Sequence, residues 1–143
     1  MSLEGQVAMV TGAAQGIGKA IALRFAREGA DIGVLDINAE PAAAVADEIR
    51  RMGRRAVVTV SDVSDPQAVG AAVEEIVAEL GRLDVLVNNA GIEKRSPFLE
   101  ITPEDWRRQI DVNLSGTFFC TQSAAREMAK RKYGRIRSLG ASG

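Results

Sequence analysis

Short apolar runs alternate along the chain with longer segments in which apolar residues recur at helical spacing. The apolar runs occupy residues 6–11, 31–36, 55–60, 83–89 and 135–139, and each has the length of a strand. The helical segments occupy residues 15–27, 40–52, 66–80 and 103–131. Strands that are apolar almost throughout are typical of a parallel sheet with helices on both faces. The pattern therefore predicts an α/β fold with a doubly wound parallel sheet.

Local signals support two of these helices and the extent of the domain. Asp65 precedes Pro66, and Thr102 precedes Pro103, so each pair has a capping residue followed by proline in the first turn. A length of 143 residues with 46% hydrophobic residues indicates one domain over residues 1–143. This domain is predicted to be a Rossmann fold that stops after its fifth strand, because the usual arrangement has a sixth.

Composition excludes several kinds of chemistry. The formal net charge is −1, which gives no field to attract nucleic acid or a membrane surface. Cations gathered between residues 126 and 137 are interpreted as side chains near a helix C-terminus, with a phosphate-binding patch as the alternative. The chain has no histidine, so histidine bases and histidine metal ligands are excluded, and no metal site is predicted. The single cysteine, Cys120, is expected to be a buried, inert thiol.

The N-terminus enters an apolar strand directly and lacks a basic stretch followed by an apolar one. No run of ~18 apolar residues is present. These two observations predict a cytoplasmic protein without a membrane span.

A glycine-rich stretch, "VTGAAQGIGKA", follows the first strand and opens the first helix. Glycine at positions 12, 16 and 18 allows a sharp turn, a close approach of the backbone to phosphate, and close packing of helix on strand. The N–H groups of the helix N-terminus favour an anion there. We therefore predict that Gly12, Gln15, Gly16, Ile17 and Gly18 bind the pyrophosphate of a dinucleotide; the alternative is that the glycines only end the strand.

Acidic residues follow the next two strands. Asp36 ends the second strand, where a carboxylate can accept hydrogen bonds from the hydroxyls of an adenosine ribose and repel a 2′-phosphate. Together with Gln15, which is uncharged, Asp36 favours NAD over NADP; a helix cap or a solvated loop carboxylate is the alternative for Asp36. Asp62, followed by Val63, comes after the third strand and can accept from the amino group of adenine.

The fourth strand ends in "NNAG", in which Asn89, Ala90 and Gly91 are predicted to border the same crevice. Adjacent asparagines at a strand end can bond neighbouring backbone, and Gly91 leaves room for a cofactor. All of these stretches fall at the carboxyl ends of strands, so they are expected to meet at one edge of one sheet.

Four motifs together resemble the classical short-chain dehydrogenase/reductase family: "TGAAQGIG", "DV" at residues 62–63, "NNAG", and "DVNLSGTFFCTQ". The resemblance implies NAD(P)-dependent hydride transfer between the nicotinamide and an alcohol or ketone, in an enzyme like the 3-oxoacyl reductases. It implies that Asn113 is a catalytic asparagine that holds a water through a local distortion of its helix; a mid-helix asparagine bonded to backbone is the alternative. It also implies a homodimer or homotetramer, formed through the helix at 103–131.

The family's remaining catalytic residues do not match. The family's serine position is occupied by Ala141, with Ser138 and Ser142 nearby, and its Tyr-x-x-x-Lys is absent from these 143 residues. Tyr133 with Arg137 imitates that motif, but it precedes the fifth strand and is rejected as a catalytic pair. We therefore expect the chain to carry the cofactor-binding half of the enzyme and to be inactive by itself. A catalytically silent NAD-binding module and an assembly fragment that pairs through its fifth strand remain alternatives.

Overall fold

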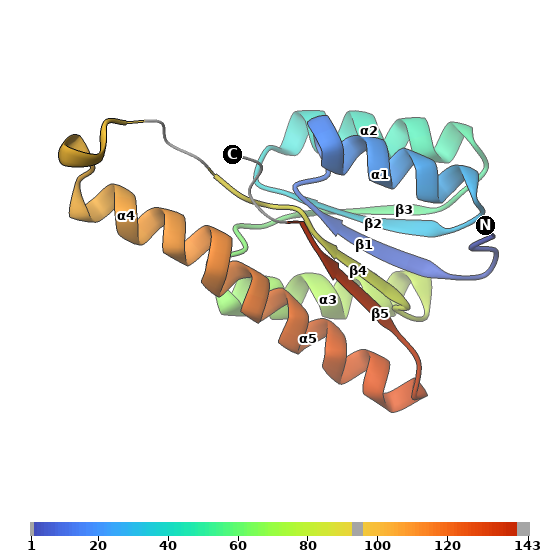
Figure 1. Ribbon diagram of the computed structural model, residues 1–143. Coiled ribbons are helices and arrows are strands. Elements are labelled where there is room, and N and C mark those ends of the chain that lie inside the picture. The colour runs from blue at the N-terminus through green and yellow to red at the C-terminus, as the bar shows by residue number, and fades with distance from the viewer. Residues whose placement is uncertain (1, 93–95, 140–143) are drawn as a thin grey trace.

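The computed structural model describes residues 2–92 and 96–139, in which five parallel strands form one sheet in the order β3-β2-β1-β4-β5 (Figure 1). The strands are β1 (Val7–Thr11), β2 (Asp31–Asp36), β3 (Ala56–Val60), β4 (Val85–Asn88) and β5 (Arg135–Ser138). The chain builds β1, β2 and β3 outward in one direction and then crosses to place β4 on the other side of β1. The order of strands reverses between β1 and β4, which is where a doubly wound sheet leaves a crevice.

Helices cover both faces of the sheet (Figure 1). One face carries α1 (Gly16–Arg27) and α2 (Ala39–Arg51), and the other carries α3 (Pro66–Leu80) and α5 (Gly116–Arg131). The buried positions of α1 are Gly18, Ala22 and Ala26, whose small side chains let this helix approach the strands closely. The predicted α/β fold with a doubly wound parallel sheet is therefore confirmed.

The segment predicted as one helix over residues 103–131 is interrupted. It consists of α4 (Pro103–Ile110), a π-helical turn η2 (Asp111–Ser115) and α5, and a short 3₁₀ turn, η1 (Phe98–Glu100), precedes it. No residue of α4 is buried, and in Figure 1 this helix projects away from the sheet. Both predicted caps are present: Asp65 accepts from the N–H groups of α3, and Thr102 accepts from the N–H of Asp105 at 3.1 Å.

The fifth strand, β5, is an edge strand of the sheet formed by the described residues. β5 pairs with β4 on one side, and three of its four residues are exposed. Arg137 is exposed at this edge among the described residues.

Two other expectations concern a membrane span and the single cysteine. Among residues 2–92 and 96–139, no helix combines the length and the hydropathy that crossing a membrane requires. Cys120 is fully buried in α5, as predicted, and burial raises the pKa of its thiol to about 12.

Candidate functional site

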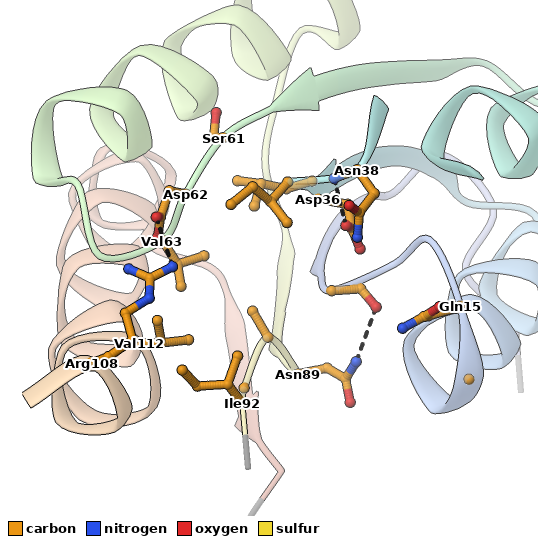
Figure 2. Close-up of a pocket in the computed structure, with 16 residues that line it drawn as sticks. Gln15, Asp36, Asn38, Ser61, Asp62, Val63, Asn89, Ile92, Arg108 and Val112 are labelled. Atoms are coloured by element: carbon orange, nitrogen blue, oxygen red, sulfur yellow. Dashed lines mark hydrogen bonds and ion pairs between the residues drawn. The ribbon is translucent and has the colours of Figure 1, made fainter. Parts of the chain in front are cut away.

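A cleft of about 360 Å³ opens at the carboxyl ends of β1 to β4, within the size range of small-molecule sites (Figure 2). Its walls come from the loops that follow these strands and from the projecting helix α4. The lining residues are Gly12, Gln15, Gly16, Leu35, Asp36, Ile37, Asn38, Ser61, Asp62, Val63, Asn89, Ala90, Gly91, Ile92, Arg108 and Val112.

The glycine-rich loop can adopt its shape only with glycine at several positions. Gly12 has φ +63° and Gly16 has φ +58°, values in the left-handed region that other residues rarely adopt. A Cβ on Gly12 would lie 3.0 Å from the Cα of Ala90, and a Cβ on Gly18 would lie 2.1 Å from the carbonyl oxygen of Gly12. The loop is therefore pressed between α1 and the end of β4.

The first turn of α1 faces this loop without any acidic side chain, and Gln15, its N-cap, makes no side-chain capping hydrogen bond. A Cβ on Gly16 would meet no protein atom within 4 Å, although Gly16 lines the cleft. The amino end of α1 thus borders open space and is not neutralised by its own first turn, which suits an anionic group.

Asp36, 7% exposed, lies at the end of β2. Its Oδ2 accepts from the N–H of Ala14 at 3.0 Å, and its Oδ1 accepts from the N–H of Asn38 at 2.9 Å. Because a carboxylate oxygen can accept more than one hydrogen bond, each oxygen keeps acceptor capacity for a ligand. The carboxylate therefore ties the glycine-rich loop to β2 while it remains part of the cleft wall.

Asp62 lies on the opposite side of the cleft, beside Arg108 of α4 (Figure 2). Its Oδ2 accepts from Nη2 of Arg108 at 3.0 Å, and its Oδ1 accepts from the hydroxyl and the N–H of Ser64 at 2.7 and 2.9 Å. Partial burial acts to raise the pKa of the Asp62 carboxyl, but the hydrogen bonds from Ser64 and then the guanidinium of Arg108 outweigh it, so the pKa is below its ordinary value. Asp62 is therefore an ionised acceptor at neutral pH.

The end of β4 is held to the end of β1. The hydroxyl of Thr11 accepts from the N–H groups of Asn89 and Ala90, each at 2.9 Å, and Nδ2 of Asn89 donates to the carbonyl of Gly12 at 3.1 Å. The neighbouring Asn88 contacts α5 instead: its Nδ2 donates to the hydroxyl of Thr121 at 3.0 Å. The prediction that the paired asparagines bond neighbouring backbone is confirmed for Asn89.

Asn113 lies in the π turn and reaches the loop after β4. Its Oδ1 accepts from the N–H of Ile92 and its Nδ2 donates to the carbonyl of Ile92, both at 2.8 Å. Its own carbonyl accepts from the hydroxyl of Thr117 at 3.0 Å. The side chain therefore spans from the distorted helix to a loop that borders the cleft. The distortion of the helix agrees with the role that the family resemblance implies for Asn113, and the hydrogen bonds of its amide to backbone agree with the alternative.

Comparison with known proteins decides the family. The family model for "short chain dehydrogenase" matches residues 6–140. The chain belongs to the short-chain dehydrogenase family.

Relatives named as dehydrogenases and reductases match almost the whole length of this chain. The chain is 42% identical to the (2S)-[(R)-hydroxy(phenyl)methyl]succinyl-CoA dehydrogenase subunit BbsD of Thauera aromatica, over 95% of this chain and 55% of that protein. It is 39% identical to the 5-keto-D-gluconate 5-reductase of Escherichia coli K12, over 94% of this chain and 53% of that protein. The solved structure of a short chain dehydrogenase from Mycobacterium paratuberculosis bound to NAD is 35% identical, with a TM-score of 0.93, over 96% of this chain and 56% of that one.

The chain therefore spans about half the length of the relatives it matches. Over that length it has the fold of the short-chain dehydrogenases.

Most of the predicted cofactor-binding residues of this short-chain dehydrogenase line the cleft. They are Gly12, Gln15, Gly16, Asp36, Asp62, Val63, Asn89, Ala90 and Gly91. Two are not among the lining residues: Ile17, which is 61% exposed, and Gly18, which is buried beneath the loop. Gly18 therefore shapes the cleft from behind, because its missing side chain lets the loop fold back on α1.

Of the three residues near the family's serine position, the structure describes only Ser138. Ala141 and Ser142 lie outside the described residues. Ser138 is at the end of β5, where its hydroxyl is 3.3 Å from Nδ2 of Asn88, and it does not belong to the cleft lining found among the described residues.

The hydroxyl of Tyr133 accepts a hydrogen bond from the side chain of Gln6 at 3.2 Å, and Gln6 lies just before the start of β1. It therefore lies at the amino ends of the strands, far from the cleft, which supports its rejection as a base.

Reasoning from the sequence missed several contributors, among them two whose side chains make hydrogen bonds at the cleft. Arg108 lines the cleft from α4, and Thr11 joins the ends of β1 and β4. Arg108 is one of two consecutive arginines in a polar helix, and Thr11 is the last residue of an apolar strand, so neither carries a local signal. Among the described residues, no group of histidine, cysteine or acidic side chains could hold a metal ion.

Proposed function

We propose that the cleft binds NAD⁺ or NADH, with the pyrophosphate at the amino end of α1, the adenosine ribose at Asp36 and the adenine at Asp62. The observation that carries this proposal is the convergence of three kinds of group at one edge of the sheet. These are a helix start without acidic residues, a glycine loop that exposes backbone, and two carboxylates that retain acceptor capacity. The relative from M. paratuberculosis, whose structure contains NAD, supports a nicotinamide cofactor.

Asp36 favours NAD over NADP in this proposal. The carboxylate can accept from ribose hydroxyls, whereas a 2′-phosphate at ~4 Å would be repelled at a cost on the order of 1–4 kcal/mol, depending on the local dielectric. The cleft lining contains one cationic side chain among the described residues, Arg108, and it is already paired with Asp62. No cation therefore lies beside Asp36 to compensate a 2′-phosphate within that described lining.

The whole protein is proposed to be an oxidoreductase that acts on an alcohol or ketone. The bound nicotinamide supplies the group that accepts or donates a hydride. Asn113 would hold the loop after β4 in place through Ile92 and contribute to the proton relay that the family resemblance implies. A 3-oxoacyl substrate stays a prediction, because the relatives' names range from a succinyl-CoA derivative to a keto-gluconate.

The 143-residue chain by itself is proposed to be inactive. Hydride transfer from an alcohol requires removal of the hydroxyl proton by a base poised near the working pH. The chain has no histidine, and its single tyrosine, Tyr133, is at the opposite end of the sheet. Purified chain should therefore turn over secondary alcohols or ketones at less than ~1 per second, by nicotinamide absorbance, which is below the usual range of enzymes. Faster turnover would show that another group serves as the base.

Calorimetric titration with NAD⁺ and NADP⁺ tests the binding proposal. The chain should bind NAD⁺ more tightly, and Asp36→Ala should reduce the ratio of the two affinities. Because Asp36 also holds the N–H of Ala14, NAD⁺ affinity itself should fall, so the ratio is the informative quantity. Asp31→Ala is the matched control: it removes the same charge at the other end of β2, where Asp31 pairs with Arg55 at 3.0 Å, and should leave the ratio unchanged.

Equal affinities in the unaltered chain, or an unchanged ratio in Asp36→Ala, would contradict the assignment of Asp36. Failure to bind either dinucleotide would refute the binding proposal and leave the assembly alternative.

A further inference from the structure

Arg108 connects the projecting helix α4 to the loop after β3. It donates from Nη2 to Oδ2 of Asp62 and from Nη1 to the hydroxyl of Ser64, both at 3.0 Å. Ser64 in turn donates its hydroxyl and its N–H to Oδ1 of Asp62. The three side chains thus form a closed ring of hydrogen bonds, which we call the Asp62 ring. Two of its members, Asp62 and Arg108, line the cleft (Figure 2).

The Asp62 ring leaves the carboxylate of Asp62 with limited capacity to accept further hydrogen bonds. A carboxylate offers about four acceptor positions, two on each oxygen. Oδ1 already accepts two hydrogen bonds from Ser64, and Oδ2 accepts one from Arg108. One position remains, on the oxygen beside the guanidinium, and the side chain of Asp62 is still 32% exposed. A ligand can therefore offer Asp62 one hydrogen-bond donor.

We propose that Arg108 is a positioning residue that orients Asp62 so that its remaining acceptor position selects a base with an exocyclic amino group, adenine over hypoxanthine. This inference rests on the proposed binding of a dinucleotide in the cleft. Adenine carries an amino donor where hypoxanthine carries a keto oxygen. A keto oxygen facing the carboxylate makes no hydrogen bond and is repelled by it. Arg108 acts through Asp62, because its two hydrogen-bonded nitrogens point at Asp62 and Ser64.

The guanidinium suits this role better than a point charge. Its planar fork bridges two acceptors on different residues, which fixes the carboxylate in rotation as well as in position. Without Arg108, Asp62 would keep its bonds from Ser64, but Oδ2 would be free to rotate toward water. The expected consequence is a loss of base discrimination with a smaller loss of general affinity.

The test measures the dissociation constants of NAD⁺ and nicotinamide hypoxanthine dinucleotide by calorimetry. It uses the full 143-residue chain and its Arg108→Met, Arg108→Lys and Arg107→Met variants. A hydrogen bond to a charged group is worth enough to give the unaltered chain a preference for NAD⁺ on the order of tenfold. Arg108→Met should reduce that preference to about threefold or less, mainly through weaker NAD⁺ binding. Arg108→Lys keeps the charge and one hydrogen bond, so its preference should lie between these two values.

Arg107→Met is the matched control, because Arg107 is the neighbouring arginine of the same helix, is exposed and does not line the cleft. Its preference should equal that of the unaltered chain. Thermal unfolding followed by circular dichroism verifies that each variant is folded; Arg108 is 45% exposed, so a large loss of stability is not expected.

Three results would overturn the inference. If Arg108→Met weakens both dinucleotides equally, Arg108 only holds α4 in place. If Arg108→Met binds NAD⁺ more tightly, the guanidinium obstructs the adenine position. If the unaltered chain binds both dinucleotides with equal affinity, Asp62 does not read the base. Failure of the unaltered chain to bind either dinucleotide is a distinguishable outcome: it refutes the proposed function, and this inference falls with it.

Discussion

Replacing Gly18 with alanine should destabilise the protein, although alanine is the better helix former. Gly18 lies in the first turn of α1, directly behind the glycine-rich loop. A Cβ there would lie 2.1 Å from the carbonyl oxygen of Gly12 and 2.4 Å from Nδ2 of Asn89. Gly12 cannot move away easily, because its other side is packed against Ala90 and its carbonyl accepts from Asn89.

The expected change in the free energy of unfolding of Gly18→Ala follows from three contributions. Overpacking of a tight site typically costs ~1–3 kcal/mol. Loss of the hydrogen bond between Asn89 and Gly12 adds about 1 kcal/mol. The gain from alanine in a helix is at most about 1 kcal/mol. The net loss in the free energy of unfolding is therefore about 1–3 kcal/mol, and NAD⁺ affinity should fall as well because the loop is displaced.

Gly70→Ala provides the matched control, since Gly70 lies inside α3 and an added Cβ would meet no atom within 4 Å. That variant should be more stable by about 0.5–1 kcal/mol. Urea denaturation followed by circular dichroism compares the two variants with the unaltered chain. Equal stability of Gly18→Ala and Gly70→Ala would refute the close contact between α1 and the loop.

Three further predictions concern acid stability, the thiol and assembly. The pKa of Asp62 is lowered in the folded protein, so the carboxylate stabilises the fold above the ordinary pKa of about 3.9, and this contribution is lost as the pH falls through the folded pKa. Asp62→Asn should therefore weaken the pH dependence of the urea midpoint in that acid range. An unchanged pH dependence would contradict the Asp62 ring. Cys120 should react with a disulfide reagent only as fast as the protein unfolds, because its thiol is buried and its pKa is about 12; immediate reaction of the native chain would contradict this. Leu114 and Phe118, 65% and 59% exposed, should contribute to a homodimer or homotetramer that Leu114→Asp weakens; sedimentation of the unaltered chain as a monomer at ~100 μM would refute this.

The sequence alone determined the elements and most of the cleft lining. Strand and helix signals are local: apolar runs of strand length, a cap followed by proline at Asp65 and Thr102, and glycine where a turn requires positive φ. Because parallel strands end at one edge of a sheet, residues just after strands were expected to share a crevice, and Gly12, Asp36, Asp62 and Asn89 all line it.

One expectation taken from the local pattern needed the structure to be corrected. The segment at 103–131 has the periodicity of one helix, and only the family resemblance implied a distortion at Asn113. The structure has a π turn there, where Asn113 reaches across to Ile92. The deciding contact is therefore with a loop outside the helix.

Only the tertiary structure decided which side chains act together. The strand order places β1 beside β4, which brings Thr11 to the N–H groups of Asn89 and Ala90 across almost eighty positions of sequence. The path of α4 brings Arg108 to Asp62, so that an arginine in an exposed helix becomes part of the cleft. Local propensity encodes whether a residue lies in a strand or a helix, but partners across the fold depend on strand order and helix placement, which are set by packing of the whole chain.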